Sequence, residues 1–273
     1  MSKKPPEPVV EALAIAVPPD RAWEALTSSK IIGDIVMGHV EMDSRPGKPF
    51  AWHWGVWEKC SPKKGSHAWS GTILDAVPGS TLVLGGGGSA ATLTVKGEGE
   101  AALVTVVHAA PADSTEDYRY GWADFLLKLK TLLERRPASS QTYLRTLVRG
   151  TPAEVLRAWL SPATMSRVLP GKVKIQAKRG GPFEWLWKHG GQRDSGRFLE
   201  IEKGHRVAFS WEASNPPSEV RLSAERTPYG ALVSLEHIGF LPARDQAERR
   251  WAHLLERLRA YFYYGKKIRT QIK

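Results

Sequence analysis

The chain has 273 residues, of which 42% are hydrophobic and 25% are charged, a balance typical of a folded globular protein that excludes a disordered one. A single hydrophobic core rarely grows beyond this length, so the length favours two domains. The longest apolar runs, such as "ALAIAV" (12–17), are far shorter than the roughly 20 residues that cross a bilayer, so we expect no membrane-spanning helix.

The net charge of +11 is unevenly distributed along the chain. Residues 1–136 contain 15 Lys/Arg and 16 Asp/Glu, a net charge of −1, whereas residues 137–273 contain 24 and 12, a net charge of +12. A basic half can attract nucleic acid, anionic lipid or an acidic ligand. Net charge bears on encounter and solubility, however, and does not define the fold.

The N-terminal residues argue against a secreted protein, and the single cysteine argues against a disulfide-rich or zinc-binding one. Prolines and Glu11 interrupt the apolar start and no small-residue cleavage site follows, so we expect no signal peptide and a cytoplasmic protein. The lone Cys60 cannot form an internal disulfide framework and has no partner at the spacing of a zinc site. We therefore expect no structural metal.

In chain order, the first half predicts a strand, short helices, several strands and one long helix. A helix starts at "PPDRAWEAL" (18–26), and an alternating aromatic strand follows at "PFAWHW" (49–54). The run "GGGG" (85–88) lacks the Lys-Ser/Thr of a phosphate loop and precedes a strand, so we predict a hairpin there. The long helix has apolar residues at helical spacing, namely Trp122, Phe125, Leu126, Leu129 and Leu133.

The second half repeats the first in the same order. A shift of 133 residues aligns the first helix with "TPAEVLRAW" (151–159) and the aromatic strand with "PFEWLW" (182–187). A shift of 125 then aligns "GTILDAVPGSTLVL" (71–84) with "GRFLEIEKGHRVAF" (196–209), so the first copy has gained eight residues after its aromatic strand. A shift of 129 aligns "ALVTVVH" (102–108) with "ALVSLEH" (231–237) and Trp122 with Trp251. Four ordered blocks indicate a tandem duplication.

The last helix of the second copy is strongly amphipathic. Its predicted apolar side contains Trp251, Leu254, Leu255, Leu258, Tyr261 and Phe262. The opposite side is predicted to contain Arg249, Arg250, Arg257 and Arg259. This helix should therefore pack its apolar side on a sheet.

The order of these motifs resembles the START-like (SRPBCC) superfamily, through the first helix, the aromatic strand, "GRFLEI", "ALVSLEHIGF" and the terminal "WAHLLERL" helix. Within it, the chain is similar to the domain shared with the C-terminal part of activators of the heat-shock protein 90 ATPase, more clearly over 146–262 than over 10–134. The resemblance implies an α+β fold of two tandem helix-grip domains, each a curved antiparallel sheet wrapped around a long C-terminal helix, often with an apolar cavity between them.

The repeat and the resemblance together predict four segments. We place the first START-like domain at 8–136 and the second at 146–264. A linker, including "PASSQ" (137–141), is predicted at 137–145, and a basic tail at 265–273.

The candidate ligand contacts lie in the second domain. Alternate residues of a strand share a face, so the rings of the second aromatic strand should point toward the terminal helix. Core packing is the commoner role of such rings, and ligand contact is the alternative. His237 and its counterpart His108 should also point inward, where a hydrogen-bonded core histidine is commoner than a reactive one. The candidate ligand contacts are Phe183, Trp185, Trp187, Trp211, His237, Trp251 and Leu255.

Three functional hypotheses remain. The leading one is a protein that holds a small hydrophobic or amphipathic ligand, mainly in the second domain. We expect it to be non-enzymatic, because the sequence contains no recognisable catalytic motif. We also expect no cofactor and no metal. The enzyme alternative is a polyketide aromatase/cyclase-like protein, for which His237 is the one acid–base group we can nominate. The third is an interaction module, either chaperone-linked or binding an acidic partner, that uses the +12 half as its contact surface. Nucleic acid is not the expected partner, because a solvated tail accounts for the C-terminal basic cluster.

Overall fold

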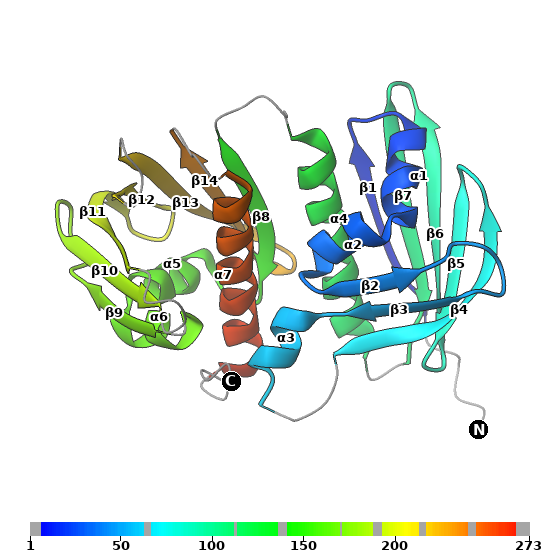
Figure 1. The fold of residues 1–273 in the computed structure, drawn as a ribbon, viewed down its shortest axis with the longest axis horizontal. Coiled ribbons are helices and arrows are strands. Elements are labelled where there is room, and N and C mark those ends of the chain that lie inside the picture. The colour runs from blue at the N-terminus through cyan, green and yellow to red at the C-terminus, as the bar shows by residue number, and fades with distance from the viewer. Residues whose placement is uncertain are drawn as a thin grey trace. The chain divides into compact units, whose positions relative to one another are not determined.

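The computed structural model describes residues 7–62, 67–111, 114–135, 141–169, 171–187, 193–212, 217–239 and 244–265. The chain divides into two compact units (Figure 1). The first comprises Met1–Gly55 and Gly65–Arg135, and the second comprises Val56–Lys64 and Arg136–Lys273. Apart from Gly265, the predicted basic tail lies outside the described residues.

The first unit is one antiparallel sheet with helices on one face. Its strands are β1 (Val9–Ile15), β2 (His39–Met42), β3 (Pro49–His53), β4 (Ala68–Val77), β5 (Thr81–Gly86), β6 (Ser89–Glu98) and β7 (Ala101–Ala109), in the order β1-β7-β6-β5-β4-β3-β2. Its helices are α1 (Pro19–Thr27), α2 (Ser29–Val36) and α4 (Thr115–Glu134).

The second unit repeats this arrangement. Its strands are β8 (Thr142–Val148), β9 (Gly171–Ile175), β10 (Pro182–Trp187), β11 (Arg193–Glu202), β12 (Arg206–Trp211), β13 (Ser218–Thr227) and β14 (Gly230–Ile238), in the order β8-β14-β13-β12-β11-β10-β9. Its helices are α5 (Pro152–Leu160), α6 (Pro162–Val168) and α7 (Arg244–Tyr264). Helix α3 (Gly55–Cys60) also belongs to this unit, except for its first residue, Gly55. The predicted α+β fold of two tandem helix-grip domains is confirmed.

The long helix of each unit covers the inner face of its sheet (Figure 1). Along β7 and β14 buried residues alternate with half-buried or exposed ones, as expected for strands with one face in a core. The buried side packs on Trp122 and Phe125 of α4 in the first unit and on Trp251 and Leu255 of α7 in the second. Burial of these alternating apolar faces is the main stabilising contribution in both units.

The predicted signals for local structure are confirmed in both copies. Thr151 and Glu154 form a capping box at the start of α5, with Pro152 in its first turn. The glycine run forms the β5–β6 hairpin, in which Gly87 and Gly88 have φ values of +60° and +76°. Two successive residues with positive φ define a hairpin turn that only glycine or a few polar residues tolerate.

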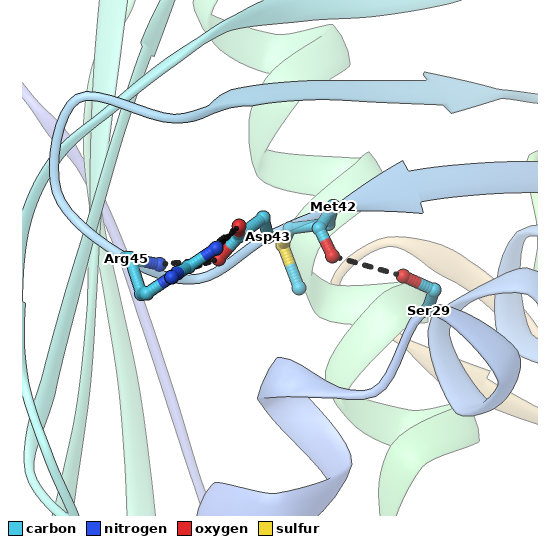
Figure 2. A network of polar contacts seen from close by, with 4 residues as sticks. All are labelled: Ser29, Met42, Asp43 and Arg45. Carbon is cyan, nitrogen blue, oxygen red and sulfur yellow. Dashed lines mark hydrogen bonds and ion pairs between the residues drawn. The ribbon is translucent and has the colours of Figure 1, made fainter.

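The β2–β3 loop of the first unit is held by short-range polar contacts (Figure 2). The hydroxyl of Ser29 donates to the carbonyl of Met42 at 3.3 Å, which ties the start of α2 to β2. The guanidinium group of Arg45 donates to both carboxylate oxygens of Asp43, at 2.5–3.1 Å, and lowers the pKa of that carboxyl to about 2. The pair is exposed, so its role is to define the loop conformation.

This loop docks on the sheet in the same way in both units. In the first unit Gly47 N–H donates to the carbonyl of Ile73 at 2.8 Å, and in the second Gly180 N–H donates to the carbonyl of Phe198 at 2.7 Å. Both acceptors lie at a bulge, between Ile73 and Asp75 and between Phe198 and Glu200. The duplication therefore preserved a backbone irregularity as well as an apolar pattern.

Two predicted boundaries differ from the structure. Strand β8 begins at Thr142, which pairs with His237, so residues 142–145 of the predicted linker 137–145 are part of the sheet. The predicted first domain, 8–136, is interrupted, because Val56–Lys64 belongs to the second unit. This segment lies within the stretch where the first copy has gained eight residues.

Two of the arginines predicted on the side of the last helix opposite its apolar residues are buried, although arginines on the polar side of a helix are normally exposed. Arg257 is 0% exposed and Arg259 is 7% exposed. The side chain of Arg257 donates to the carbonyls of Val168 and Arg167 and to Sγ of Cys60, the last at 3.3 Å. Burial raises the pKa of the Cys60 thiol, so it is a neutral acceptor at pH 7. Helical periodicity cannot reveal a segment that covers the polar side of a helix.

Segment α3 supplies the remaining partners of this buried polar cluster. Nε1 of Trp57 donates to Oε2 of Glu256 at 2.7 Å, and the guanidinium of Arg259 lies 5.1 Å from the Trp57 ring centre. The same ring packs against Tyr263 and Tyr264, at centroid distances of 5.3 and 5.8 Å. A segment inserted in the first copy thus completes the core of the second unit.

The glycine at equivalent positions of β4 and β11 should be indispensable to the sheet. A Cβ at Gly71 would lie 1.9 Å from the carbonyl oxygen of Gly85, and one at Gly196 would lie 1.8 Å from that of Ser210. We expect G71A and G196A each to lower the free energy of unfolding by more than about 2 kcal/mol in urea titrations. G121A in α4, where nothing lies within 4 Å, should raise it by up to about 1 kcal/mol. Equal effects of all three would contradict this account.

Removal of the Trp57 ring should destabilise the second unit. We expect W57A to lower its free energy of unfolding by about 3 kcal/mol, because a buried aromatic ring and a donor to a buried carboxylate are both lost. W57F keeps the ring packing and should lower it by about 1–2 kcal/mol. Hydrogen exchange of α7 amides separates this unit from the first; unchanged exchange in W57A would show that α3 does not stabilise α7.

Candidate functional site

The aromatic strand β10 and its neighbours bring together most of the predicted ligand contacts. Phe183 and Trp185 are 3% and 1% exposed, whereas Trp187 at the strand end is half-buried. Strand β12 adds Phe209 and Trp211, α5 adds Trp159, and α7 adds Trp251 and Leu255. Alternation along the strand, as predicted, directs these rings to one side.

The rings in this cluster touch one another directly. The centroid distances are 4.8 Å between Trp211 and Trp251, 5.8 Å between Trp185 and Trp211, 6.2 Å between Trp185 and Trp251, and 5.7 Å between Trp159 and Trp185. These separations are those of packed aromatic pairs. Core packing is therefore the observed arrangement of these rings, and their contact with a ligand stays a prediction.

His237 is held on both sides of its ring. Nε1 of Trp251 donates to Nδ1 of His237 at 3.0 Å, so the proton of the neutral ring is on Nε2 and donates to the hydroxyl of Ser218 at 2.7 Å. Burial, with a smaller effect of Arg250, lowers the pKa of His237 to about 4. The predicted inward position is confirmed, since the side chain is 0% exposed.

The first unit contains the same Trp–His pair. Nε1 of Trp122 donates to Nδ1 of His108 at 2.8 Å, and burial lowers the pKa of His108 to about 4. Ser89 occupies the position equivalent to Ser218 but donates to the carbonyl of Gly86 instead. A pair that recurs in both copies is a structural element of the domain and not a feature of one specialised site.

Asp194 and Arg250 form an ion pair beside the aromatic cluster. Neither residue is among the ligand contacts predicted from the sequence. Asp194 is 0% exposed, and its Oδ2 accepts from Nε1 of Trp187 and from Nη2 of Arg250, each at 2.5 Å. The guanidinium carbon of Arg250 lies 5.4 Å from the Trp187 ring centre and 5.9 Å from that of Trp211. Asp194 shares its strand face with Gly196 and Phe198, so alternation along β11 could have revealed an inward carboxylate.

Three polar atoms in this cluster are buried without a partner among the described residues. They are Nε1 of Trp159, Nε1 of Trp185 and Oδ1 of Asp194. Trp185 and Asp194 face each other as cross-strand partners of β10 and β11. An unsatisfied buried donor or acceptor costs about 1–3 kcal/mol, and more than nine in ten are normally paired. Two donors and one acceptor in one aromatic cluster are therefore unusual.

The first unit fills the equivalent space differently. Trp69 stands at the position equivalent to Asp194, and Gly86 stands at the position equivalent to Trp211. The Trp69 ring lies 5.6 Å from His108 and 5.8 Å from Trp52, and its Nε1 donates to the carbonyl of Gly86 at 3.1 Å. In the second unit, Trp211 of β12 occupies the equivalent space beside His237, and β11 has room for a carboxylate.

Neither a candidate metal cluster nor a membrane-spanning helix occurs in the part of the chain that the structure describes. No group of three or more His, Cys, Asp or Glu side chains there could hold a metal ion. No helix within those residues is long and apolar enough to cross a membrane. The cytoplasmic location stays a prediction.

The family model for the activator of Hsp90 ATPase homolog 1-like protein matches residues 16–134 and 149–263. The chain therefore belongs to this family and carries two tandem copies of its domain. The resemblance inferred from the sequence is confirmed in both halves. No protein with a curated description matches the chain.

Several solved structures match the chain at low identity and low TM-score. A protein of the dynemicin biosynthetic locus, DynU16, is 18% identical, with 94% of this chain and 97% of that chain covered and a TM-score of 0.40. The Aha1 dimer from Colwellia psychrerythraea is 14% identical, with 46% and 98% covered and a TM-score of 0.41. CalU16 from Micromonospora echinospora is 24% identical, with 45% and 79% covered and a TM-score of 0.38.

The buried histidines predict a loss of stability in mild acid. Their pKa of about 4 in the folded protein lies below the 6.5 of a free histidine, so the unfolded chain binds protons first as the pH falls. The stabilisation is complete above about pH 6.5 and is lost toward pH 4. Between pH 7 and 5 we expect a loss of roughly 1–2 kcal/mol per histidine, measured by urea titration.

A matched set of variants assigns this acid sensitivity. H108Q and H237Q should each flatten the pH dependence of the free energy of unfolding. Part of the sensitivity should persist in both, because burial also lowers the pKa of His253 to about 4. An unchanged slope in H237Q would mean that its ring is protonated equally in the folded and unfolded states.

Proposed function

We propose that the second unit binds a small hydrophobic or amphipathic molecule between the inner face of its sheet and α7, without catalysing a reaction. The observation that carries this proposal is the set of unpaired polar atoms on Trp159, Trp185 and Asp194 among packed aromatic rings. A guest with donor and acceptor groups would pair them and recover the free energy that their burial costs. The rings supply apolar surface for the body of the guest.

The second unit is the better candidate because its polar atoms are complementary. It offers donors on two indole rings and an acceptor on Asp194. In the first unit the unpaired atoms described on the inner rings are Nε1 of Trp52 and Nε2 of His108, and the position of Asp194 is occupied by Trp69. The first unit therefore lacks the carboxylate that would fix a polar guest.

The half-buried members of the cluster indicate where a guest would enter. Trp187 and Arg250 are partly exposed, whereas Trp185 and Trp211 are buried. Because the inner rings are in contact, binding requires them to separate. Entry past Trp187 and Arg250 is consistent with these exposures.

Neither alternative gains support from a specific contact. A polyketide aromatase/cyclase-like reaction would use His237 for proton transfer, but both of its ring nitrogens are already hydrogen-bonded within the core. The chaperone-linked alternative relies on an acidic partner of the basic half. Exposed Lys172, Lys174, Arg193 and Arg197 on β9 and β11 fit that charge, yet no described contact identifies the partner.

Naphthalene, a wholly apolar probe, tests binding in the second unit. We expect saturable binding, measured by tryptophan fluorescence and by a rise in the thermal midpoint at saturating probe. L255F places a larger side chain on the α7 face of the site and should weaken binding at least about tenfold, a loss of roughly 1.4 kcal/mol. L126F makes the same change at the equivalent, equally buried position of α4 and should not.

Both variants can be overpacked, so the stability of each is measured without probe first. Overpacking is expected to cost about 1–3 kcal/mol in either unit. No saturable binding of either naphthalene or its hydroxylated analogue 2-naphthol by the unmodified protein would refute the proposal. An equal loss of binding in L255F and L126F would remove the assignment to the second unit.

A further inference from the structure

We infer that the guest of the second unit is a hydroxylated aromatic molecule whose hydroxyl group binds between Trp185 and Asp194. This inference rests on the proposed function and specifies the ligand class. It follows from the chemistry of the unpaired atoms, the position of Arg250 and the difference between the two units.

Asp194 supplies a fixed acceptor inside the aromatic cluster. Its side chain is 0% exposed, and Oδ2 receives hydrogen bonds from Trp187 and Arg250. These two donors orient the carboxylate and compensate its charge. Oδ1 has no donor among the residues that the structure describes. A carboxylate oxygen can accept further hydrogen bonds, so Oδ1 requires a donor.

Trp185 supplies the complementary donor. Its Nε1 is buried and finds no acceptor within the described part of the chain. Trp185 and Asp194 are direct cross-strand partners, which places their Cβ atoms about 5 Å apart on the same face. Trp159, whose Nε1 is also unpaired, lies against Trp185 at 5.7 Å between ring centres.

A hydroxyl group satisfies both requirements at once. Its oxygen can accept from an indole N–H while its hydrogen donates to the carboxylate. A carboxylic acid group, ionised at pH 7, would have no hydrogen to donate and would face the charge of Asp194. An ammonium group could donate to Asp194 but offers no lone pair to the indoles. Among these groups, a hydroxyl is the one that fits all the unpaired atoms.

The surrounding rings favour an aromatic body for the same ligand. Phe183, Trp211 and Trp251 contact Trp185 at centroid distances between 5.1 and 6.2 Å. A planar guest can replace such contacts by stacked or edge-to-face ones of similar strength. The first unit offers no such match, because Trp69 replaces Asp194 and removes the acceptor.

A comparison of naphthalene with 2-naphthol separates this inference from the proposed function. The hydroxyl makes 2-naphthol less hydrophobic, so purely apolar binding predicts weaker binding of 2-naphthol. The inferred hydrogen bonds predict the opposite, with 2-naphthol binding about tenfold tighter, since a hydrogen bond to a charged group contributes about 1.5–3 kcal/mol. The measurement is titration calorimetry on the full chain at pH 7, with 2-naphthoate as an anionic control that should bind more weakly than 2-naphthol.

Two variants test the residues, and one controls for ring substitution. W185F keeps an aromatic ring and removes the donor, and D194N replaces an acceptor by a donor; each should abolish the preference for 2-naphthol. D194N also breaks a buried ion pair and can unfold the unit, so W185F is the primary variant. W52F makes the same change at the equivalent position of the first unit and should retain the preference.

Proton–nitrogen correlation spectra of the unmodified protein give a second readout. The indole N–H signal of Trp185, assigned by its loss in W185F, should move downfield with 2-naphthol and less with naphthalene. Binding of naphthalene without preference for 2-naphthol would overturn the hydroxyl inference and leave the proposed function intact, as expected if a buried water already pairs these atoms. Binding of neither probe would overturn both. Loss of the preference in W52F would also overturn the assignment to Asp194.

Discussion

In each unit one long helix packs against the inner face of a seven-stranded sheet, and the packing of large aromatic rings against that helix is the interaction on which the rest of the unit depends. Strands β3 and β10 direct their rings toward α4 and α7, where Trp122 and Trp251 meet them. The hydrogen bonds from these tryptophans to His108 and His237 fix the helix to strands β7 and β14, each of which lies next to an edge strand of its sheet. Because the rings bury far more area than aliphatic side chains, they can fill the space that a curved sheet leaves beside one helix.

The packing of the long helix on the sheet is the same in both copies, whereas some of the side chains in the two cores differ. The first unit places a tryptophan on β4 and a glycine on β5, whereas the second places an aspartate on β11 and a tryptophan on β12. Both solutions put an indole ring beside the buried histidine. The second also introduces a buried carboxylate, held by Arg250 and Trp187. A change that keeps an indole ring beside the histidine can therefore introduce a buried polar group into a core.

The two units are also unequal in how their cores are completed. Segment α3 comes from the first copy in sequence but belongs to the second unit, where Trp57 and Cys60 satisfy Glu256 and Arg257. Buried arginines are tolerated there because carbonyl and thiol acceptors surround them. The extra residues of the first copy are thus explained by a role in the second unit. A comparison of the two sequences shows these residues only as an insertion and does not reveal that role.

The sequence by itself determined the duplication, the α+β class, the order of helices and strands along the chain, the capping of α5 and the inward position of the aromatic strand and of both histidines. These features follow from local periodicity and from the repetition of motifs, which are properties of neighbouring residues. The tertiary structure decided the burial of Arg257, the early start of β8, and the meeting of Asp194 with Arg250 and Trp187. Those features depend on contacts between residues far apart in the chain, such as the 56 positions that separate Asp194 from Arg250, and no local pattern encodes which distant side chain will compensate a buried charge.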